Sequence, residues 1–452
     1  MNFQNPKILK LLKNISLTIL LLTTIGTFNA ARSQDVYNLD RCIQTALENN
    51  FSLKVARNKT DIASNNFTRG NAGMLPTVSS TNRFGGNLNN SNQISADGTS
   101  TQKNGVYNST GSAAVNLGMT IFRGFQVQRS YEKLGQLSEL ENLKTQMELE
   151  NLVAQIVSEY NYYIQQLTLY QNLAYAVSLS RERVRIDEQR YMLGGASKVE
   201  YLQSMVYLNS DSSRYSRQKE VLRTSQIRLN ELMANEDIGQ SIILADSLID
   251  INTSLAYDEL MTKTLELNTG LQIAAKNQII TDLDRKIIES RAYPYLTANA
   301  GYGYNYYGNM QSAGYNQHTT GLNYGLTLGV DLFDGFNRRR EKTNALIELE
   351  NRKMQYSEVE QAIKADLLTI FYAYQNNLNL LRLEEQNLDV ARENLEIALE
   401  RYKLGSLAGL ELREVQKSLL DAEERLISVK YQTKLAEISL MQVSGDIMRY
   451  LN

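Results

Sequence analysis

Residues 401–415 read RYKLGSLAGLELREV and interrupt a run of sequence that is otherwise helical in pattern. Residues 190–204, RYMLGGASKVEYLQS, interrupt a second helical run in the same way. Glycine readily adopts the left-handed backbone conformation that lets a chain turn back at the end of a helix. We therefore predict two long helical hairpins, with tips near Gly194 and Gly405.

These two stretches belong to an internal repeat. The YxLG tips begin at Tyr191 and Tyr402, which are 211 residues apart (402 − 191 = 211), and IFRGF at 121–125 is separated from LFDGF at 332–336 by the same distance. Two copies of this size predict a pseudo-symmetric chain rather than an array of short repeats.

Each copy opens with a helix-like stretch that ends at a proline. Pro76 and Pro294 are 218 residues apart, so the second copy has a loop that is seven residues shorter (218 − 211 = 7). Proline cannot continue a helix and disfavours helix in the residue before it. We expect helices over 39–69 and 257–292, each followed by a strand.

Apolar residues then alternate with glycine or polar residues in a period of two, which is typical of strands with one apolar face. The ranges are about 77–90, 111–122, 295–307 and 322–333. A soluble sheet with one wet face and a transmembrane barrel both fit this alternation. The tyrosine-rich strand ends, the glycine-rich polar faces and the long polar loops favour the barrel.

A barrel needs more strands than one chain supplies, because an open sheet edge in lipid leaves backbone groups without hydrogen bonds. Two copies of the chain would give eight strands around a filled interior, and three would give twelve around a usable lumen.

The helical arms carry a heptad pattern that predicts coiled-coil packing. An unbroken helix over 336–402 would be about 100 Å long at about 1.5 Å per residue. Arms of this length do not fit into one globular core and must project from the sheet. The apolar seam of the last arm steps by three and four residues: Leu412, Val415, Leu419, Ala422, Leu426, Val429, Thr433, Ala436, Leu440 and Val443.

The N-terminus and the composition narrow the function. Residues 1–33 have a basic start and a short apolar core and are predicted to be a secretory signal peptide, cleaved after Ser33 or Ala30. Its removal takes away four positive charges and leaves a mildly acidic chain, which argues against nucleic-acid binding. With one histidine (His318, in a predicted polar loop) and one half-buried cysteine (Cys42), we expect no metal, no cofactor and no enzyme activity.

The predicted organisation of the mature chain has three parts. The first repeat covers 34–234 and contains the long hairpin 125–234. A connector at 235–256 lies at the side of the helical bundle, and the second repeat covers 257–452 with the hairpin 336–449.

With the repeat, the strands and the tips in place, the chain resembles the TolC-like outer-membrane efflux protein family. The prolines before strands, LFDGF in register with IFRGF, and the two YxLG tips carry the resemblance. It implies an α+β membrane protein in which three chains, each giving four strands, form a 12-stranded outer-membrane barrel above periplasmic α-helical coiled-coil hairpins.

The resemblance also implies a gate and a docking surface at the periplasmic tips. Family members close this end with two acidic rings, which fall on Glu411 and Glu414 here, and Glu200 and Gln203 hold the matching places in the first copy. A locking hydrogen bond would join Tyr402 to Glu200, whereas a locking arginine of some members falls on Leu407. The adaptor-contacting residues of the two tips would be Leu193, Gly194, Gly195, Leu404, Gly405 and Ser406.

The function implied is that of a passive outer-membrane exit duct of a tripartite efflux pump or a type I secretion system in a Gram-negative bacterium. The partners implied are two further copies of the chain, outer-membrane lipid, a periplasmic adaptor and an inner-membrane transporter of the RND or ABC type. The alternative is a structural or adhesive outer-membrane protein whose coiled coils only extend from the surface.

Overall fold

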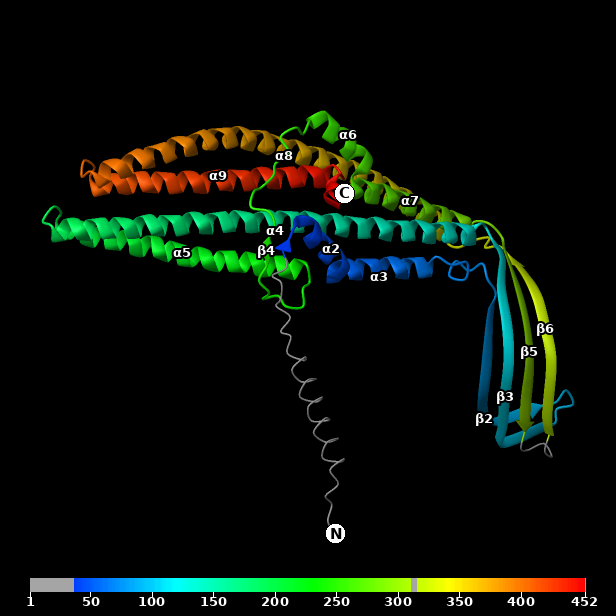
Figure 1. The fold of residues 1–452 in the computed structure, drawn as a ribbon. Coiled ribbons are helices and arrows are strands. Elements are labelled where there is room, and N and C mark those ends of the chain that lie inside the picture. The colour runs from blue at the N-terminus through cyan, green and yellow to red at the C-terminus, as the bar shows by residue number, and fades with distance from the viewer. Residues whose placement is uncertain (1–35, 310–314, 452) are drawn as a thin grey trace, which may run out of the picture.

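The computed structural model describes residues 36–309 and 315–451. The expected signal peptide and the loop over 310–314 lie outside these ranges. Two long helical hairpins run side by side, with the four long strands together at one end and the hairpin tips at the other (Figure 1). The first hairpin is α4 (Gln126–Met192) and α5 (Lys198–Leu232), and the second is α8 (Asn337–Lys403) and α9 (Gly409–Val443).

The helix bounds of the two hairpins follow the 211-residue repeat without any shift. The bounds of α8 and α9 are those of α4 and α5 shifted by 211, and each long helix has 67 residues, about 100 Å of helix. The predicted seam of α9 is largely buried, with Leu412, Ala422 and Leu440 almost inaccessible to solvent. Burial of this seam against α8, rather than helix propensity alone, keeps such long arms together.

The sheet has the order β2-β3-β5-β6 and is antiparallel throughout. Its strands are β2 (Thr77–Ile94), β3 (Ser100–Arg123), β5 (Tyr295–Asn309) and β6 (Tyr315–Gly329). Cross-strand pairs such as Leu117–Ala300 and Ala300–Tyr324 set the apolar side chains of neighbouring strands on one face. β2 and β6 form the two edges.

The strand limits differ from the expected ranges. The hairpins extend further from the helices, so His318 lies in β6, where it pairs with Tyr306 and its Nδ1 is 2.6 Å from the hydroxyl of Tyr304. At the other end β6 stops at Gly329 rather than at 333. β5 begins at Tyr295, because Pro294 has no N–H to donate to the sheet. Tyr295 pairs with Gly329, so residues after Gly329 have no partner on β5.

A left-handed corner joins the sheet to each long helix. Gly124 and Phe125 both have positive φ (56° and 67°), as do Gly335 and Phe336 (66° and 64°). A Cβ on Gly124 would lie 2.2 Å from the carbonyl oxygen of Ser290, so only glycine fits there. Each strained phenylalanine stacks edge-to-face on the aromatic ring three residues before it.

Each expected single helix before the sheet is in fact two helices. The first copy has α2 (Leu39–Asn49) and α3 (Phe51–Asn66), and the second has α6 (Tyr257–Leu267) and α7 (Thr269–Ser290). The breaks fall at Asn50 and Asn268, which are 218 residues apart. The prediction of one helix was wrong because an asparagine can stop one helix and start the next with its own side chain.

Both asparagines make the same two hydrogen bonds. The Oδ1 atom of Asn50 accepts from the Leu53 N–H at 3.1 Å, and its Nδ2 donates to the Leu232 carbonyl at 3.1 Å. In the second copy, Asn268 caps the Leu271 N–H and donates to the carbonyl of Val443. Each asparagine therefore ties the end of a return helix to the start of the short helix stacked above it. We call these contacts the asparagine joints.

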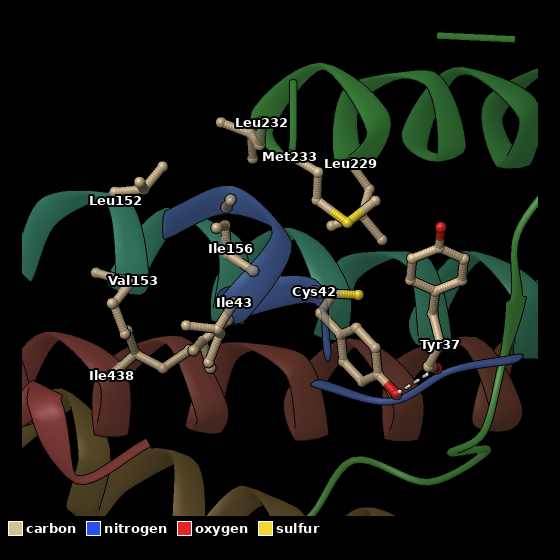
Figure 2. Packing of buried hydrophobic residues seen from close by; sticks show 14 of the residues in the cluster. Tyr37, Cys42, Ile43, Leu152, Val153, Ile156, Leu229, Leu232, Met233 and Ile438 are labelled. Atoms are coloured by element: carbon tan, nitrogen blue, oxygen red, sulfur yellow. Dashed lines mark hydrogen bonds between the residues drawn. The ribbon is translucent and has the colours of Figure 1, made fainter. Parts of the chain in front are cut away.

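A core at mid-length packs β1 (Val36–Tyr37), α2, α4, α5 and the C-terminal 3₁₀ helix η1 (Ile447–Leu451) together (Figure 2). β1 pairs in parallel with β4 (Ile243–Leu244), which anchors the connector after α5. Cys42 is completely buried here rather than half-buried, and burial raises the pKa of its thiol to about 12.

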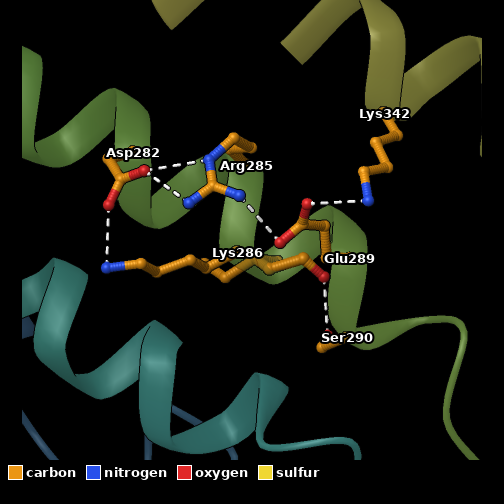
Figure 3. Close-up of polar contacts among 7 residues, drawn as sticks. Asp282, Arg285, Lys286, Glu289, Ser290 and Lys342 are labelled. Carbon is orange, nitrogen blue, oxygen red and sulfur yellow. Dashed lines mark hydrogen bonds and ion pairs between the residues drawn. The ribbon is translucent and has the colours of Figure 1, made fainter. Parts of the chain in front are cut away.

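Ion pairs join α7 to α8 near the sheet (Figure 3). Arg285 binds Asp282 and Glu289 on its own helix, and Glu289 also pairs with Lys342 of α8 at 3.2 Å. These side chains are partly exposed, so they orient the two helices more than they stabilise them.

The asparagine joints generate a prediction. Replacing Asn50 or Asn268 with alanine removes a cap and a long-range hydrogen bond, which should cost about 1–2 kcal/mol locally. Amide exchange at Leu53 or Leu271 should then accelerate by about 5- to 30-fold. Mass spectrometry of exchange in the purified protein measures this. Asn66→Ala, at the end of α3, is the matched control, and equal exchange in all three variants would contradict the role of the joints.

Candidate functional site at the hairpin tips

Both tips are closed by the same glycine turn. Gly194 has φ +75° and Gly405 has φ +77°. The N–H after each glycine bonds back to Arg190 at 2.7 Å or Arg401 at 2.9 Å, which is the Schellman pattern that satisfies the last carbonyls of a helix. Leu193 and Leu404 project from the turns and are 86% and 82% exposed, so each tip presents a leucine that packs on nothing in this chain.

The two return helices begin differently. α5 has a capping box, in which the Ser197 hydroxyl accepts from the Glu200 N–H and the Glu200 carboxylate accepts from the Ser197 N–H at 2.7 Å. This hydrogen bond lowers the pKa of Glu200 below its ordinary value. α9 starts after Ala408, which has no side chain that can cap. The copies therefore diverge at the place where the gate is expected.

Tyr402 does not bond to Glu200. Its hydroxyl donates to the carboxylate of Asp187 on α4, and both side chains are at least 97% buried. Burial, together with this hydrogen bond, raises the pKa of Tyr402 to about 12, so the hydroxyl stays protonated at neutral pH and remains a donor. The expected pairing was wrong because Glu200 is engaged in capping its own helix.

A second link joins the hairpins deeper in the tip. Arg413 of α9 binds Asp211 of α5 through two parallel bonds of 2.7 and 2.8 Å. The ring of Tyr207 lies between two guanidinium groups, 5.0 Å from that of Arg413 and 5.2 Å from that of Arg183. We call Arg183, Asp187, Tyr207, Asp211, Tyr402 and Arg413 the tip network. It holds the first hairpin to the second by charge-assisted bonds that little water reaches.

Asp187 and Asp211 were missed by the sequence reasoning, although the repeat contains a signal for them. Their counterparts 211 residues on are Ala398 and Ala422, which are both buried. A carboxylate where the other copy buries alanine must be paired, and each of the two has a partner on the second hairpin.

The remaining gate candidates lie at the surface. Glu411 and Glu414 on the first turns of α9 are exposed, and Gln203 is exposed on α5. Within the part of the chain that the structure describes, neither glutamate side chain forms a hydrogen bond or an ion pair. Leu407, the position of the arginine of some family members, packs against the apolar cluster of the second tip.

Comparison with known proteins agrees with the fold. The sequence model described as "Outer membrane efflux protein" matches residues 260–446. The chain is 23% identical over 235 residues to the outer membrane protein TolC of Vibrio cholerae, an alignment that spans 50% of this chain and 52% of that protein.

The second repeat of the chain thus resembles the outer membrane efflux proteins.

Solved structures share its fold over most of their length. The VceC outer membrane protein of Vibrio cholerae superposes with a TM-score of 0.74 at 17% identity, covering 90% of this chain and 96% of VceC. The CmeC outer membrane channel of Campylobacter jejuni gives 0.75 at 16% identity, covering 92% and 88%. The four strands and long helical hairpins are thus the α+β fold of these outer-membrane channels.

The sheet has an apolar face that is compatible with a lipid environment. Leu322, Tyr324 and Leu328 are 67–82% exposed in the single chain, and Val78 and Val115 are more than half exposed on the same face. Such a patch in water is unfavourable, whereas lipid accepts it. In the described ranges, no helix is both long and apolar enough for a membrane span.

The tip network generates a prediction. Arg413→Gln leaves Asp211, which is 1% exposed, without its bidentate partner and should destabilise the contact between α5 and α9 by about 3–5 kcal/mol. Cysteines introduced on facing positions of α5 and α9 near the tip should then crosslink more slowly. Lys417→Gln, on the exposed side of α9, is the matched control, and unchanged crosslinking in Arg413→Gln would exclude a latching role.

Proposed function

We propose that this protein is the outer-membrane exit duct of a tripartite efflux pump or a type I secretion system, and that it passively conducts substrates delivered by an inner-membrane transporter. The observation that carries the proposal is a sheet with an exposed apolar face attached to hairpins of about 100 Å. A membrane sheet continued by so long a helical stem suits a conduit that crosses both the outer membrane and much of the periplasm.

The sheet edges support assembly from three copies. β2 and β6 each pair on one side only, so a single chain in lipid would leave two rows of backbone groups without hydrogen bonds. Pairing β6 of one copy with β2 of the next removes these edges. Three copies then supply twelve strands, which enclose a lumen, whereas eight would enclose mostly side chains.

The helices support the same assembly. A groove of about 1070 Å³ between α3 and α4 is lined by both polar and apolar side chains, and the apolar ones include Phe51 (74% exposed) and Ile62 (60% exposed). α8 carries two runs of apolar residues at seven-residue spacing that are each more than half exposed: Ile347 and Met354 near the sheet, and Leu383, Val390 and Ile397 toward the tip. A neighbouring copy is the proposed occupant, because it would bring helices with apolar surface of the same kind to this groove and to these runs.

The gate is assigned to the acidic residues of the α9 tip. Glu411 and Glu414 lie at i and i+3 on one helical face, and three copies would stack them as two carboxylate rings. Among the described residues neither carboxylate forms a hydrogen bond or an ion pair, which supports this role because a pore-facing carboxylate must be available to ions. Glu200 and Gln203 of α5 would flank the rings. Such rings attract cations and raise the barrier for anions.

The exposed tips are assigned to a periplasmic adaptor. Leu193, Leu404 and the glycines beside them lie at the far end from the sheet, where a protein anchored in the inner membrane would reach them. The adaptor would connect the duct to a transporter of the RND or ABC type.

Loss of the chain tests the duct directly. In the native host, deletion of its gene should raise intracellular accumulation of exported dyes or lower export of a secreted protein, and the intact gene should restore transport. Transport that is unaffected for every compound and protein assayed would contradict the proposal. Native mass spectrometry of the purified protein should give a complex of three chains, and a monomer would contradict the shared barrel.

The gate has its own test in planar bilayers. Replacing Glu411 and Glu414 together with alanine removes up to six negative charges from the pore of a trimer and should raise cation conductance or abolish block by divalent cations. Glu424→Ala, a carboxylate further along α9, is the control for a general charge effect. Equal conductance and block in the wild type and the double variant would argue against the acidic rings.

A further inference from the structure

A groove of about 680 Å³ lies between the two hairpin tips and is lined by two arginines and two carboxylates. Arg183 and Arg190 of α4 line it together with Tyr402 and the first turn of α9, whereas Val199 and Leu410 stand at its rim, 73% and 64% exposed. The tip network described above accounts for the deeper residues but leaves this groove without a role.

Arg183 is a guanidinium group with unused donors. It is 94% buried, yet its Nε and Nη1 atoms make no hydrogen bond. The nearest carboxylate oxygen, Oδ2 of Asp187, is 3.6 Å from Nε, and the other oxygen of Asp187 accepts from Tyr402. Buried donors of a charged group are costly to leave without hydrogen bonds, so an added acceptor would stabilise this arginine beyond its ion pair with Asp187.

The start of α9 has unused donors as well. No side chain caps this 35-residue helix, so the N–H groups of its first turn have no partner within the helix and carry the positive end of the helix dipole. The equivalent helix α5 is capped by Ser197. Uncapped N–H groups of this kind bind anions readily.

These two sets of donors face the same space. A Cβ on Gly409, the first residue of α9, would lie 2.9 Å from Nη2 of Arg183, so the helix start and the guanidinium group are neighbours. A Cβ on Gly405 would likewise lie 2.9 Å from Nη2 of Arg190. The guanidinium carbon of Arg190 lies 5.4 Å from the centre of the Tyr402 ring. Asp187 and Glu200, the acidic residues that line the groove, are already engaged by Tyr402 and Ser197.

We propose that this groove binds a carboxylate, and specifically an acidic side chain on the docking segment of the periplasmic partner. Arg183, Arg190 and the free N–H groups of α9 would hold the carboxylate, since a fork of guanidinium donors matches two carboxylate oxygens. The apolar rim favours a protein segment over a free small anion, because Val199 and Leu410 offer contacts that a small anion cannot use. The assignment to a partner rests on the function proposed above.

Amide exchange of the purified full-length protein, with sodium glutarate as the probe, tests the site. Against sodium chloride at equal ionic strength, glutarate should slow exchange in the first turn of α9 at least about fivefold, because it supplies the missing acceptor. Arg183→Gln should lose this protection, whereas Arg185→Gln should keep it, since Arg185 is exposed and paired with Glu182. Absence of protection in the wild type, or equal protection in Arg183→Gln, would overturn the site.

A second variant covers the case in which Arg183→Gln disturbs the tip. Ala408→Ser supplies the cap that α9 lacks and should slow exchange of the same amides without any anion, leaving little further effect of glutarate. A glutarate effect of wild-type size in Ala408→Ser would mean that the anion binds elsewhere, and the site would be wrong.

A transport assay distinguishes docking of a partner protein in the groove from binding of a free anion. Arg190→Glu reverses one charge in the groove and should reduce efflux in cells severalfold, whereas Arg185→Glu should not. Transport that is normal in Arg190→Glu while glutarate still protects α9 in the wild type would limit the groove to free anions and refute its role in docking. Protection without any transport by the wild-type protein would refute the duct and leave the carboxylate site.

Discussion

The left-handed corner between sheet and helix determines how the rest of the molecule is arranged. Two successive residues with positive φ, Gly124–Phe125 and Gly335–Phe336, turn the chain from a strand into a helix of 67 residues. A phenylalanine in this conformation costs about 1–2 kcal/mol, and an edge-to-face aromatic pair recovers about 0.5–1.5 kcal/mol of it. Every later contact, from the asparagine joints to the tips, depends on the direction that this corner gives to α4 and α8.

The two copies use one backbone for different chemistry. Helix bounds, corners and tip glycines repeat with an offset of 211, so the scaffold is nearly symmetric. The side chains at the tips are not symmetric. The first copy has Asp187 and Asp211 at positions where the second copy has alanine. The return helix of the first copy, α5, has a side-chain cap, whereas α9 of the second copy has none. The asymmetry concentrates paired charges and unused donors at the tips, away from the sheet.

The sequence predicted the repeat, the strands, the long arms and the tip glycines because each depends on local pattern: period two, heptads, proline and glycine. It did not predict the breaks at Asn50 and Asn268, because an asparagine within a helical pattern can equally be a polar residue on the helix surface. The breaks become evident only from the long-range acceptors of the two side chains, the carbonyls of Leu232 and Val443. The contact of Tyr402 was misassigned for the same reason. Which carboxylate a buried hydroxyl reaches is decided by the packing of α4 against the second hairpin, and spacing along the chain does not contain that information.

The asparagine joints also have a mechanical consequence. α4 and α8 run unbroken from the sheet to the tips, whereas their shorter neighbours are each made of two pieces joined by one side chain. A continuous rod transmits torque, and a jointed one does not. A rotation of α5 or α9 at the tips can therefore leave α3 and α7 in place beside the sheet, so that it need not strain the strands.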